Sequence, residues 1–591
     1  MQDKTERTEA TGQNYRGWQS DVIVDLIKRY DFPHITLNPG ASFRGLHDSL
    51  VNYGGNEPPM MLCQHEEIAV QIAHGYAKAS GKPMAVILHN LVGLLHACMA
   101  IYYAYIDRVP IFIIGATGPM DEGKRRPHID WTHSALVQGN AVRDYVKWDY
   151  QPTAIEGVPE SFARAYSIMT TEPQGPVYMC YDAALQEAPL AHDVPLPPAG
   201  MVATPARMAP DPAAIAAIAD KLIKAEHPLL LAEYAGRRAG GFESIVELAE
   251  TAGAAVWDVN NALNFPNKHP LCLSMDKDTL RHTDLVVGLD VNDWEKQLTE
   301  LNNAKRTREQ LTPPSCDFVE IGFGEINISK WAFDYCRMQP CSVRALGDTA
   351  LGIPELTRIC KQRIAGDAKL ASRIAARKRA IGKRHDEVWA QWQEEARENW
   401  DASPTTFSRL ALEVWDVIKD EDWIVANGTG RDWARRIWDW RPERSYGGSG
   451  GAGLGYGLPA ALGVALAHRG SGKVCVNLQA DGDLLYVISG FYTAAHHRLP
   501  LLTVTFNNRT YGNDEAHQDA VAKARGRPVE NKVIGIRIDD PAPDFAKIAQ
   551  GFGIHAEGPI DAAEAVGPAL RRALRVVKDG RPAVVDVLTR F

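Results

Sequence analysis

The chain has 591 residues, of which 45% are hydrophobic, and its formal net charge at pH 7 is −9. A chain of this length is expected to form three or more domains of about 100 to 200 residues, each with a buried core. The negative net charge gives no electrostatic footprint for nucleic acid, and no apolar run approaches the ~18 residues that span a bilayer. We therefore expect a protein that binds neither nucleic acid nor membrane.

The cysteines and the first residues of the chain bear on its compartment. Nine cysteines are scattered from Cys63 to Cys475 without paired spacing, and the odd number favours reduced thiols over disulfide bonds or a zinc site. The first fourteen residues are polar and charged and show no signal-peptide pattern. These features predict a cytoplasmic protein.

In the first third of the chain, short apolar strands alternate with helical patterns. Strands are predicted at 34–37, 84–88, 109–114 and 177–181. This alternation is typical of a doubly wound α/β unit with a parallel sheet. We place the first domain at residues 1–190 and interpret the Pro-rich stretch 189–210 as a linker.

Two neighbouring carboxylates lie at a predicted junction between a strand and a helix. The apolar stretch 59–63 leads to Glu66 and Glu67, and apolar residues at helical spacing continue to about Gly81. On position alone, either glutamate is interpreted as a solvated residue at a helix N-terminus, where the helix dipole favours negative charge.

The middle of the chain predicts a second α/β unit, which we place at 205–365. Its predicted strands are 229–231, 255–256 and 285–287. The following segment, 369–399, is rich in Lys, Arg, Glu and Ala. It is predicted to form a solvated helix between domains rather than an interaction surface.

The last unit, 400–591, carries two polar motifs that follow predicted strands. Asp481 comes after the apolar run 474–478, and Asn508 comes after the strand 501–506. The carboxyl ends of neighbouring parallel strands meet at one edge of a sheet, where open α/β sheets bind ligands. Mg²⁺ takes about six oxygen ligands, often from one or two carboxylates and substrate phosphates. We predict that the Asp481 carboxylate, the Asn508 amide oxygen and the Thr510 main-chain carbonyl bind Mg²⁺.

The spacing from Asp481-Gly482 to Asn507-Asn508, with strands on both sides, resembles the signature of thiamine-diphosphate (ThDP) enzymes of the decarboxylase and acetolactate-synthase superfamily. The resemblance implies an α/β fold of three doubly wound parallel-sheet domains. The first domain (1–190) would bind the pyrimidine ring of ThDP, and the last domain (400–591) would bind its diphosphate with Mg²⁺. The domain at 205–365 would be the central domain. It also implies a homodimer or homotetramer with shared active sites.

In this superfamily a glutamate protonates N1′ of the aminopyrimidine ring, and the ring then removes the C2 proton to give the reactive carbanion. The block from His65 to Pro83 resembles the segment that carries this glutamate. The resemblance therefore implies that Glu66 is catalytic, and Glu67 keeps the interpretation of a solvated carboxylate. Burial against the ring would raise the pKa of Glu66, which suits proton transfer near neutral pH.

The resemblance implies cofactor contacts on a glycine run and on the two motifs. Leu454 corresponds to the bulky residue that holds ThDP bent, although an ordinary core leucine is an alternative. Asp483 stands where the family has a small residue, and a carboxylate beside a diphosphate is unfavourable unless it points away. The implied cofactor-binding residues are Glu66, Asn427, Thr429, Gly430, Ala452, Leu454, Asp481, Gly482, Asp483, Asn508, Thr510, Tyr511 and Gly512.

The N-terminal third is most similar to benzoylformate decarboxylases, which implies further proton-transferring residues. His89 corresponds to a histidine that relays protons there, and His133 lies in a segment that contributes active-site side chains. Asp514 falls where pyruvate decarboxylases have a catalytic glutamate. A lone histidine is more often structural, and Asp514 could equally lie at a solvated helix N-terminus. Ala41 replaces a serine that contacts substrate, which weakens a direct transfer of activity.

The implied reaction is addition of the ThDP carbanion to a carbonyl, followed by loss of CO₂ or another leaving group. Non-oxidative decarboxylation of a 2-oxo acid is the preferred interpretation. The alternatives are an acetolactate synthase-like carboligase, a C–C lyase and a non-catalytic ThDP-binding paralogue. FAD, which some relatives bind in the central domain, is not expected, because 233–237 replaces the usual glycine cluster.

Overall fold

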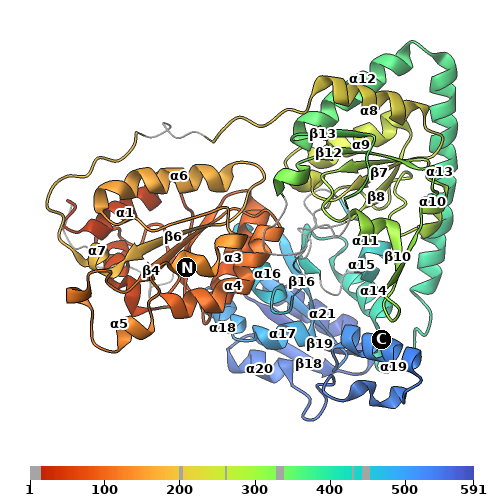
Figure 1. Ribbon diagram of the computed structural model, residues 1–591. Helices are drawn as coiled ribbons and strands as arrows, with labels where there is room; N and C mark the ends of the chain where they lie inside the picture. Colours follow the sequence, from red (N-terminus) through yellow and green to blue (C-terminus); the bar gives the residue numbers. More distant parts are fainter. Residues whose placement is uncertain are drawn as a thin grey trace. The chain divides into compact units, whose positions relative to one another are not determined.

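The computed structural model describes residues 15–198, 204–259, 263–327, 338–428, 432–441, 451 and 453–590. These residues form three parallel sheets with flanking helices and one two-stranded antiparallel sheet (Figure 1), which confirms the predicted fold class. The chain divides into two compact units, Met1–Ala206 with Ser449–Ser471 and Val487–Leu501, and Arg207–Gly448 with Gly472–Tyr486 and Leu502–Phe591. The limits of the three predicted domains, 1–190, 205–365 and 400–591, stay predictions.

The sheet of the first unit has the strand order β2-β1-β3-β4-β6-β5 and only parallel pairs. Its strands are β1 (Ile35–Leu37), β2 (Met60–Leu62), β3 (Met84–Ile87), β4 (Ile111–Thr117), β5 (Trp148–Tyr150) and β6 (Val177–Asp182). The four predicted strands are confirmed, and the stretch 59–63 contains β2. The sequence does not predict β5, because it is three residues long and only partly buried.

Nine helices of this unit are described. They are α1 (Gln19–Arg29), α2 (Arg44–Asp48), α3 (Glu66–Ser80), α4 (Leu91–Ile106), α5 (Ile129–Thr132), α6 (Val158–Thr170), α7 (Ala183–Glu187), α16 (Gly457–Ala467) and α18 (Gly490–His496). As predicted, α3 begins at Glu66 and ends before Gly81, whose φ of 69° is the left-handed conformation that favours glycine at a helix C-terminus.

Two glycines allow α3 and α16 to pack backbone against backbone. A Cβ at Gly75 would lie 1.9 Å from the carbonyl oxygen of Ala460, and one at Gly463 would lie 2.0 Å from that of Ile72. No side chain fits at either distance. The contact therefore fixes α16, which begins at Gly457, against the helix that begins with Glu66.

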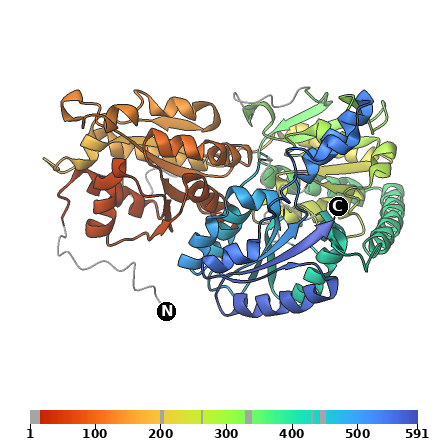
Figure 2. The same cartoon turned by 90° about the horizontal axis from the view of Figure 1, so that it is seen from below.

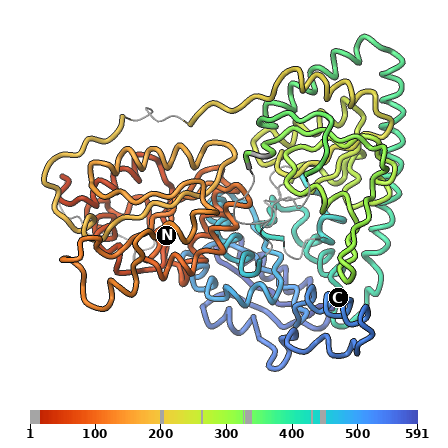
Figure 3. The backbone as a smooth tube through the Cα atoms, in the orientation of Figure 1, coloured from red at the N-terminus to blue at the C-terminus, as the bar shows by residue number. Residues whose placement is uncertain are grey.

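The central sheet of the second unit has the order β13-β12-β9-β7-β8, all parallel. Its strands are β7 (Pro228–Ala232), β8 (Ala255–Asp258), β9 (Leu285–Leu289), β12 (Asp317–Gly322) and β13 (Val343–Leu346), beside the antiparallel hairpin β10 (Thr299–Asn302) and β11 (Thr307–Gln310). The helices that accompany them are α8 (Pro212–Lys224), α9 (Gly241–Ala252), α10 (Lys277–His282), α11 (Trp294–Leu298) and α12 (Thr349–Ala365). The predicted charged helix is confirmed as α13 (Ala368–Glu395), the long green coil of Figure 3.

The other sheet of this unit has the order β14-β19-β17-β16-β15, and β18 also pairs with β19 (Figure 2, teal to blue). Its strands are β14 (Thr405–Thr406), β15 (Trp423–Gly428), β16 (Val474–Ala480), β17 (Leu501–Asn507), β18 (His555–Ile560) and β19 (Ala583–Arg590). Its helices are α14 (Phe407–Ile418), α15 (Asp432–Ile437), α17 (Asp481–Tyr486), α19 (Gly512–Arg525), α20 (Phe545–Gly551) and α21 (Ala563–Lys578). Among the described residues, no helix has the length and apolarity needed to cross a membrane.

The contact between α3 and α16 predicts that replacement of Gly75 destabilises the protein more than replacement of a glycine outside the contact. We expect Gly75→Ala to lower the free energy of unfolding by about 1–3 kcal/mol, because the added methyl group must push two backbones apart. The control is Gly157→Ala, since no atom lies within 4 Å of a Cβ there. Urea denaturation followed by circular dichroism measures both. Equal midpoints for the two variants would contradict the close contact.

Candidate active site

The two predicted metal-binding motifs lie together at the end of their sheet. Strand β16 ends at Ala480 and α17 begins at Asp481, while β17 ends at Asn507. The backbone N–H of Arg509 donates a hydrogen bond of 2.7 Å to Oδ2 of Asp481, and the N–H of Thr510 donates one of 3.1 Å to Oδ1 of Asn508. The loop after β17 is therefore folded directly onto the Asp481 carboxylate.

Ionisation of Asp481 is unfavourable at this buried position. It is 2% exposed, and burial raises its pKa to about 6, although the N–H groups of Gly482 and Arg509 act in the opposite direction. A bound cation would offset this cost. A carboxylate, an amide oxygen and a main-chain carbonyl are the hard oxygen ligands that Mg²⁺ prefers, so this set of residues fits Mg²⁺.

Gly482 is required by the ring of Tyr511. A Cβ at position 482 would lie 2.6 Å from Cε1 of Tyr511, which is closer than side-chain atoms approach one another. The glycine of the first motif thus lets the tyrosine of the second motif lie over it. This contact and the hydrogen bond of Arg509 pack the two motifs against each other.

Asp483 points into the interior of the sheet. Nε2 of Gln479 donates a hydrogen bond of 2.6 Å to its Oδ2. Nδ2 of Asn477 donates to Oε1 of Gln479 at 3.0 Å, and Nδ2 of Asn427 donates to Oδ1 of Asn477 at 2.9 Å. The extra carboxylate is therefore held by a buried chain of amides. The same chain engages the side chain of Asn427, a predicted cofactor contact.

A second buried carboxylate near Asp481 was not predicted from the sequence. Asp586 on β19 is fully buried and accepts hydrogen bonds of 3.1 and 3.3 Å from Nδ2 of Asn507. Burial raises its pKa to about 7; Asn507 acts to lower it, and the charge of Asp481 raises it further. The available signal was an aspartate inside the apolar run 583–588, where a charge is rarely placed without a partner.

Glu66, the first residue of α3, is buried and hydrogen-bonded through both carboxylate oxygens. Nδ2 of Asn38 donates to Oε1 at 3.1 Å, and Nδ1 of His96 lies 3.2 Å from Oε2. Burial acts to raise the pKa of Glu66, but the hydrogen bonds from Asn38, from its own backbone N–H and from His96 outweigh burial, and the pKa lies below its usual value. Our expectation of a raised pKa was wrong for this environment, because the sequence did not reveal these donors.

His89 and His133, two of the residues predicted to transfer protons, lie close together. Their rings meet edge to face with centroids 5.9 Å apart. Oγ of Ser42 lies 2.8 Å from Nδ1 of His89 and accepts the N–H of Asn90 at 3.0 Å. Burial and the neighbouring His133 lower the pKa of His89, which favours the neutral ring.

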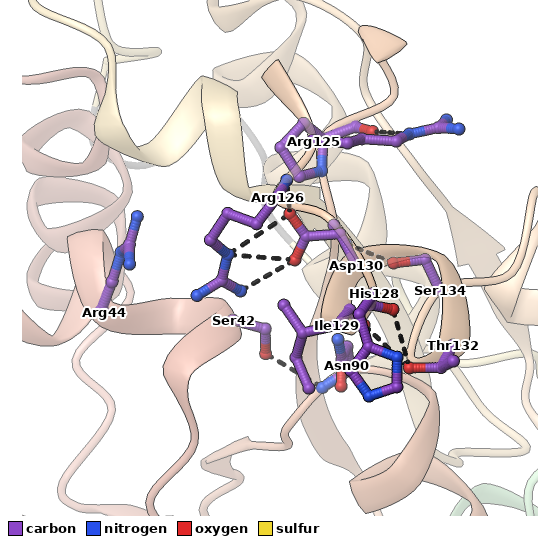
Figure 4. A network of polar contacts seen from close by, with 12 residues as sticks. Ser42, Arg44, Asn90, Arg125, Arg126, His128, Ile129, Asp130, Thr132 and Ser134 are labelled. Atoms are coloured by element: carbon purple, nitrogen blue, oxygen red, sulfur yellow. Dashed lines mark hydrogen bonds and ion pairs between the residues drawn. The ribbon is translucent and has the colours of Figure 1, made fainter. Parts of the chain in front are cut away.

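The segment that carries His133 is anchored by one ion pair (Figure 4). The carboxylate of Asp130 accepts the backbone N–H of Arg126 at 2.7 Å and its guanidinium at 2.8 Å. A cavity of about 310 Å³ lies beside this pair and is also lined by Ala41, Arg44 and Glu187. The ion pair thus fixes the turn that precedes His133.

The remaining predicted residues are less enclosed. No residue of α19 is buried, and Asp514 is exposed, which agrees with the interpretation as a solvated helix N-terminus. Leu454 is 37% exposed, so it is not a core leucine, and its carbonyl accepts the hydroxyl of Tyr103 at 3.3 Å. The predicted cofactor residues Thr429, Gly430 and Ala452 lie outside the described residues.

Two family models match the parts of the chain that carry these features. Residues 18–137 match the N-terminal TPP binding domain of thiamine pyrophosphate enzymes, and residues 426–587 match their C-terminal TPP binding domain. The first match contains Glu66 and His89, and the second contains Asp481 and Asn508. The chain belongs to the ThDP-dependent enzyme superfamily.

Relatives of this ThDP enzyme include both decarboxylases and carboligases. Benzoylformate decarboxylase of Pseudomonas aeruginosa is 26% identical over 581 residues, which covers 92% of this chain and 96% of that protein. The chloroplastic acetolactate synthase of Arabidopsis thaliana is 22% identical and covers 96% of this chain and 81% of that protein. The structure of benzoylformate decarboxylase from Polynucleobacter necessarius is 20% identical with a TM-score of 0.75 over 97% of this chain and 99% of that chain, and it supports the fold.

Asp586 predicts a pH dependence of the stability of this ThDP enzyme. Its pKa is about 7 in the folded chain, whereas an unfolded aspartate titrates near about 3.9. Between these values the folded chain keeps a proton that the unfolded chain has released, so the free energy of unfolding falls as the pH rises through this window. We expect Asp586→Asn to weaken this fall between about pH 4 and pH 7.

Thermal unfolding of the metal- and cofactor-free protein measures the effect of Asp586→Asn. Asp579→Asn is the matched control, because Asp579 is exposed at the end of α21. Asp481 also has a raised pKa and its charge acts on Asp586, so the profile of Asp586→Asn reports the loss of Asp586 together with the change in the titration of Asp481. Identical pH profiles for Asp586→Asn and the wild-type protein would contradict the role of Asp586.

Proposed function

We propose that the protein is a Mg²⁺- and ThDP-dependent decarboxylase of a 2-oxo acid. The observation that carries this proposal is the loop of Asn508 folded onto the buried carboxylate of Asp481 by a hydrogen bond of 2.7 Å from Arg509. This hydrogen bond supports the proposal, because it holds the loop that carries Asn508 and Thr510 against the Asp481 carboxylate at the carboxyl edge of the sheet. Glu66 supplies a second buried carboxylate in the part of the chain that matches the N-terminal TPP binding domain.

The proposed roles divide between holding the cofactor and moving protons. Asp481, Asn508 and the Thr510 carbonyl would hold Mg²⁺, and the metal would hold the diphosphate. When bound, ThDP supplies a carbanion that adds to a carbonyl and stores the electron pair left after loss of CO₂. Glu66 would exchange a proton with the pyrimidine ring, and its hydrogen bonds to Asn38 and His96 orient the carboxylate for that exchange.

His89 and His133 are proposed to handle protons of the reacting substrate. The neutral ring of His89, fixed by Ser42, can donate or accept a proton near neutral pH, and His133 lies against it. Leu454 is proposed to support the bent cofactor, since its exposed side chain is available for contact. Asp514 is retained only as a group that a substrate could reach, because it is exposed.

We further propose a homodimer or homotetramer in which Glu66 of one subunit serves the metal site of another. The support is the resemblance to enzymes that share their active sites in this way. No FAD is proposed for the central domain. The support is the stretch 233–237 after β7, which replaces the glycine cluster usual in relatives that bind FAD.

A carboligase is the second candidate, because acetolactate synthases are among the relatives. The two functions share every step until CO₂ is lost and differ in whether a proton or a second carbonyl compound is then taken up. Identities of 22–26% to both classes of relative leave the choice between the two reactions to experiment.

Replacement of Glu66 tests the acid–base role. We expect Glu66→Gln to bind ThDP with Mg²⁺, measured by quenching of tryptophan fluorescence, and to lose turnover by at least about a hundredfold, because an amide does not transfer the proton. Glu67→Gln is the control at the adjacent position and is expected to keep turnover. Normal activity of Glu66→Gln would remove Glu66 from the mechanism.

A substrate panel separates the candidate reactions. Purified protein with ThDP and Mg²⁺ is incubated with pyruvate, branched 2-oxo acids, phenylpyruvate and benzoylformate, and CO₂ and organic products are measured by mass spectrometry. We expect CO₂ with an aldehyde. Acyloin or acetohydroxy-acid products would favour the carboligase, and no product despite bound ThDP would contradict the proposed decarboxylation of these acids.

A further inference from the structure

Glu66 is shielded from solvent, although an acid–base group must exchange its proton with something. Its side chain is 5% exposed. The bond from Asn38 to Oε1 comes from an amide, which does not titrate. Nδ1 of His96 lies 3.2 Å from Oε2 and belongs to an imidazole, whose two ring nitrogens can each carry a proton. Among the described residues, His96 is the only titratable side chain that is hydrogen-bonded to the Glu66 carboxylate.

Helix α4 brings His96 to the carboxylate through two positions on one face. Gly93 lies one turn before His96, and a Cβ at Gly93 would lie 2.9 Å from Oε1 of Glu66. The missing side chain allows the helix to approach. The side chain of His96 is 51% exposed, so its ring reaches from the buried carboxylate toward solvent.

The other histidines near Glu66 form hydrogen bonds with other partners. The ring of His65 stacks on that of His96 with centroids 4.9 Å apart, and its Nδ1 accepts the N–H of Glu67 at 3.2 Å. Burial lowers the pKa of His65, which favours its neutral form. His89 interacts with the charge of Glu66 but is hydrogen-bonded to Ser42. His96 therefore has the direct hydrogen bond.

A metal ion does not explain this cluster. The ligand atoms of His65, Glu66 and His96 lie within 4.8 Å of one another. A zinc ion about 2.0–2.1 Å from two imidazole nitrogens must lie near the plane of both rings. The two rings are stacked with only 24° between their planes, so their lone pairs do not converge on one point. The geometry suits a proton rather than a metal.

We infer that His96 is a positioning residue that relays protons between Glu66 and solvent, an inference that rests on the proposed function. Glu66 in its acid form returns its proton to Nδ1 of His96, the ring becomes imidazolium, and the proton on Nε2 leaves to water. The reverse sequence protonates Glu66, and no other bond changes. His96 acts through Glu66 and resets it between catalytic cycles.

Deuterium exchange at C2 of ThDP in the holoenzyme tests the relay without a substrate. Samples are quenched with acid and read by NMR. We expect His96→Asn to slow the exchange by at least about tenfold, because the amide keeps a hydrogen-bond donor near Oε2 but does not carry a proton through. Fluorescence quenching should show that ThDP and Mg²⁺ still bind. The control is His192→Asn, since His192 and Glu156 form an exposed pair at 3.0 Å.

Chemical rescue distinguishes a relay from a merely structural contact. In His96→Gly, added imidazole is expected to restore the exchange in proportion to its concentration, with a pH profile that follows the ionisation of the added base. Two results would overturn the relay: exchange at the wild-type rate in His96→Asn, or slow exchange in His96→Gly that imidazole leaves unchanged. Absence of exchange in the wild-type holoenzyme would overturn the proposed function as well, which separates the two failures.

Discussion

The carboxylate of Asp481 is buried where a sheet ends. Burial of its negative charge is unfavourable, and the neighbouring groups are placed so that they stabilise it. Taking a carboxylate out of water disfavours its charged form unless donors or a cation replace the lost solvation. The backbone N–H groups of Gly482 and Arg509 supply part of that replacement. They do so because the loop after β17 folds over the start of α17, with the ring of Tyr511 against Gly482.

The other buried polar groups near this point follow the same constraint in different ways. Asp586 keeps a raised pKa beside Asp481 and is held by Asn507, so two close carboxylates need not both be charged. Asp483 is matched by the amide of Gln479, which is matched in turn by Asn477. Each group finds a partner inside the sheet, and the strand ends that carry the metal ligands are thereby held in register.

In the N-terminal part, the surroundings of the buried Glu66 carboxylate depend on glycines that allow helices to pack closely. Glycines at 75 and 463 bring α16 onto α3, and Gly93 brings α4 onto the carboxylate that begins α3. With two donors on Glu66, its pKa lies below the usual value instead of above it. A group with a low pKa needs a neighbour that can deliver a proton to it, and the imidazole of His96 is in place to do so.

The sequence by itself determined the features that depend on short stretches of chain. The limits of α3, the strands β1, β3, β4 and β6 and the helix α13 follow from local periodicity and from the glycine after α3. The meeting of Asp481 with the loop of Asn508 also followed, because each motif comes directly after a strand and neighbouring parallel strands end at one edge.

Only the tertiary structure decided which distant side chains share an environment. His96 lies thirty positions from Glu66, and Asp586 lies far beyond Asn508, and neither partnership leaves a local pattern. The direction of the pKa of Glu66 and the inward orientation of Asp483 depend on those partners. Desolvation and hydrogen bonding act over a few ångströms in space, whereas periodicity acts along the chain, so the chemistry of this ThDP enzyme's carboxylates emerges only when the chain is folded.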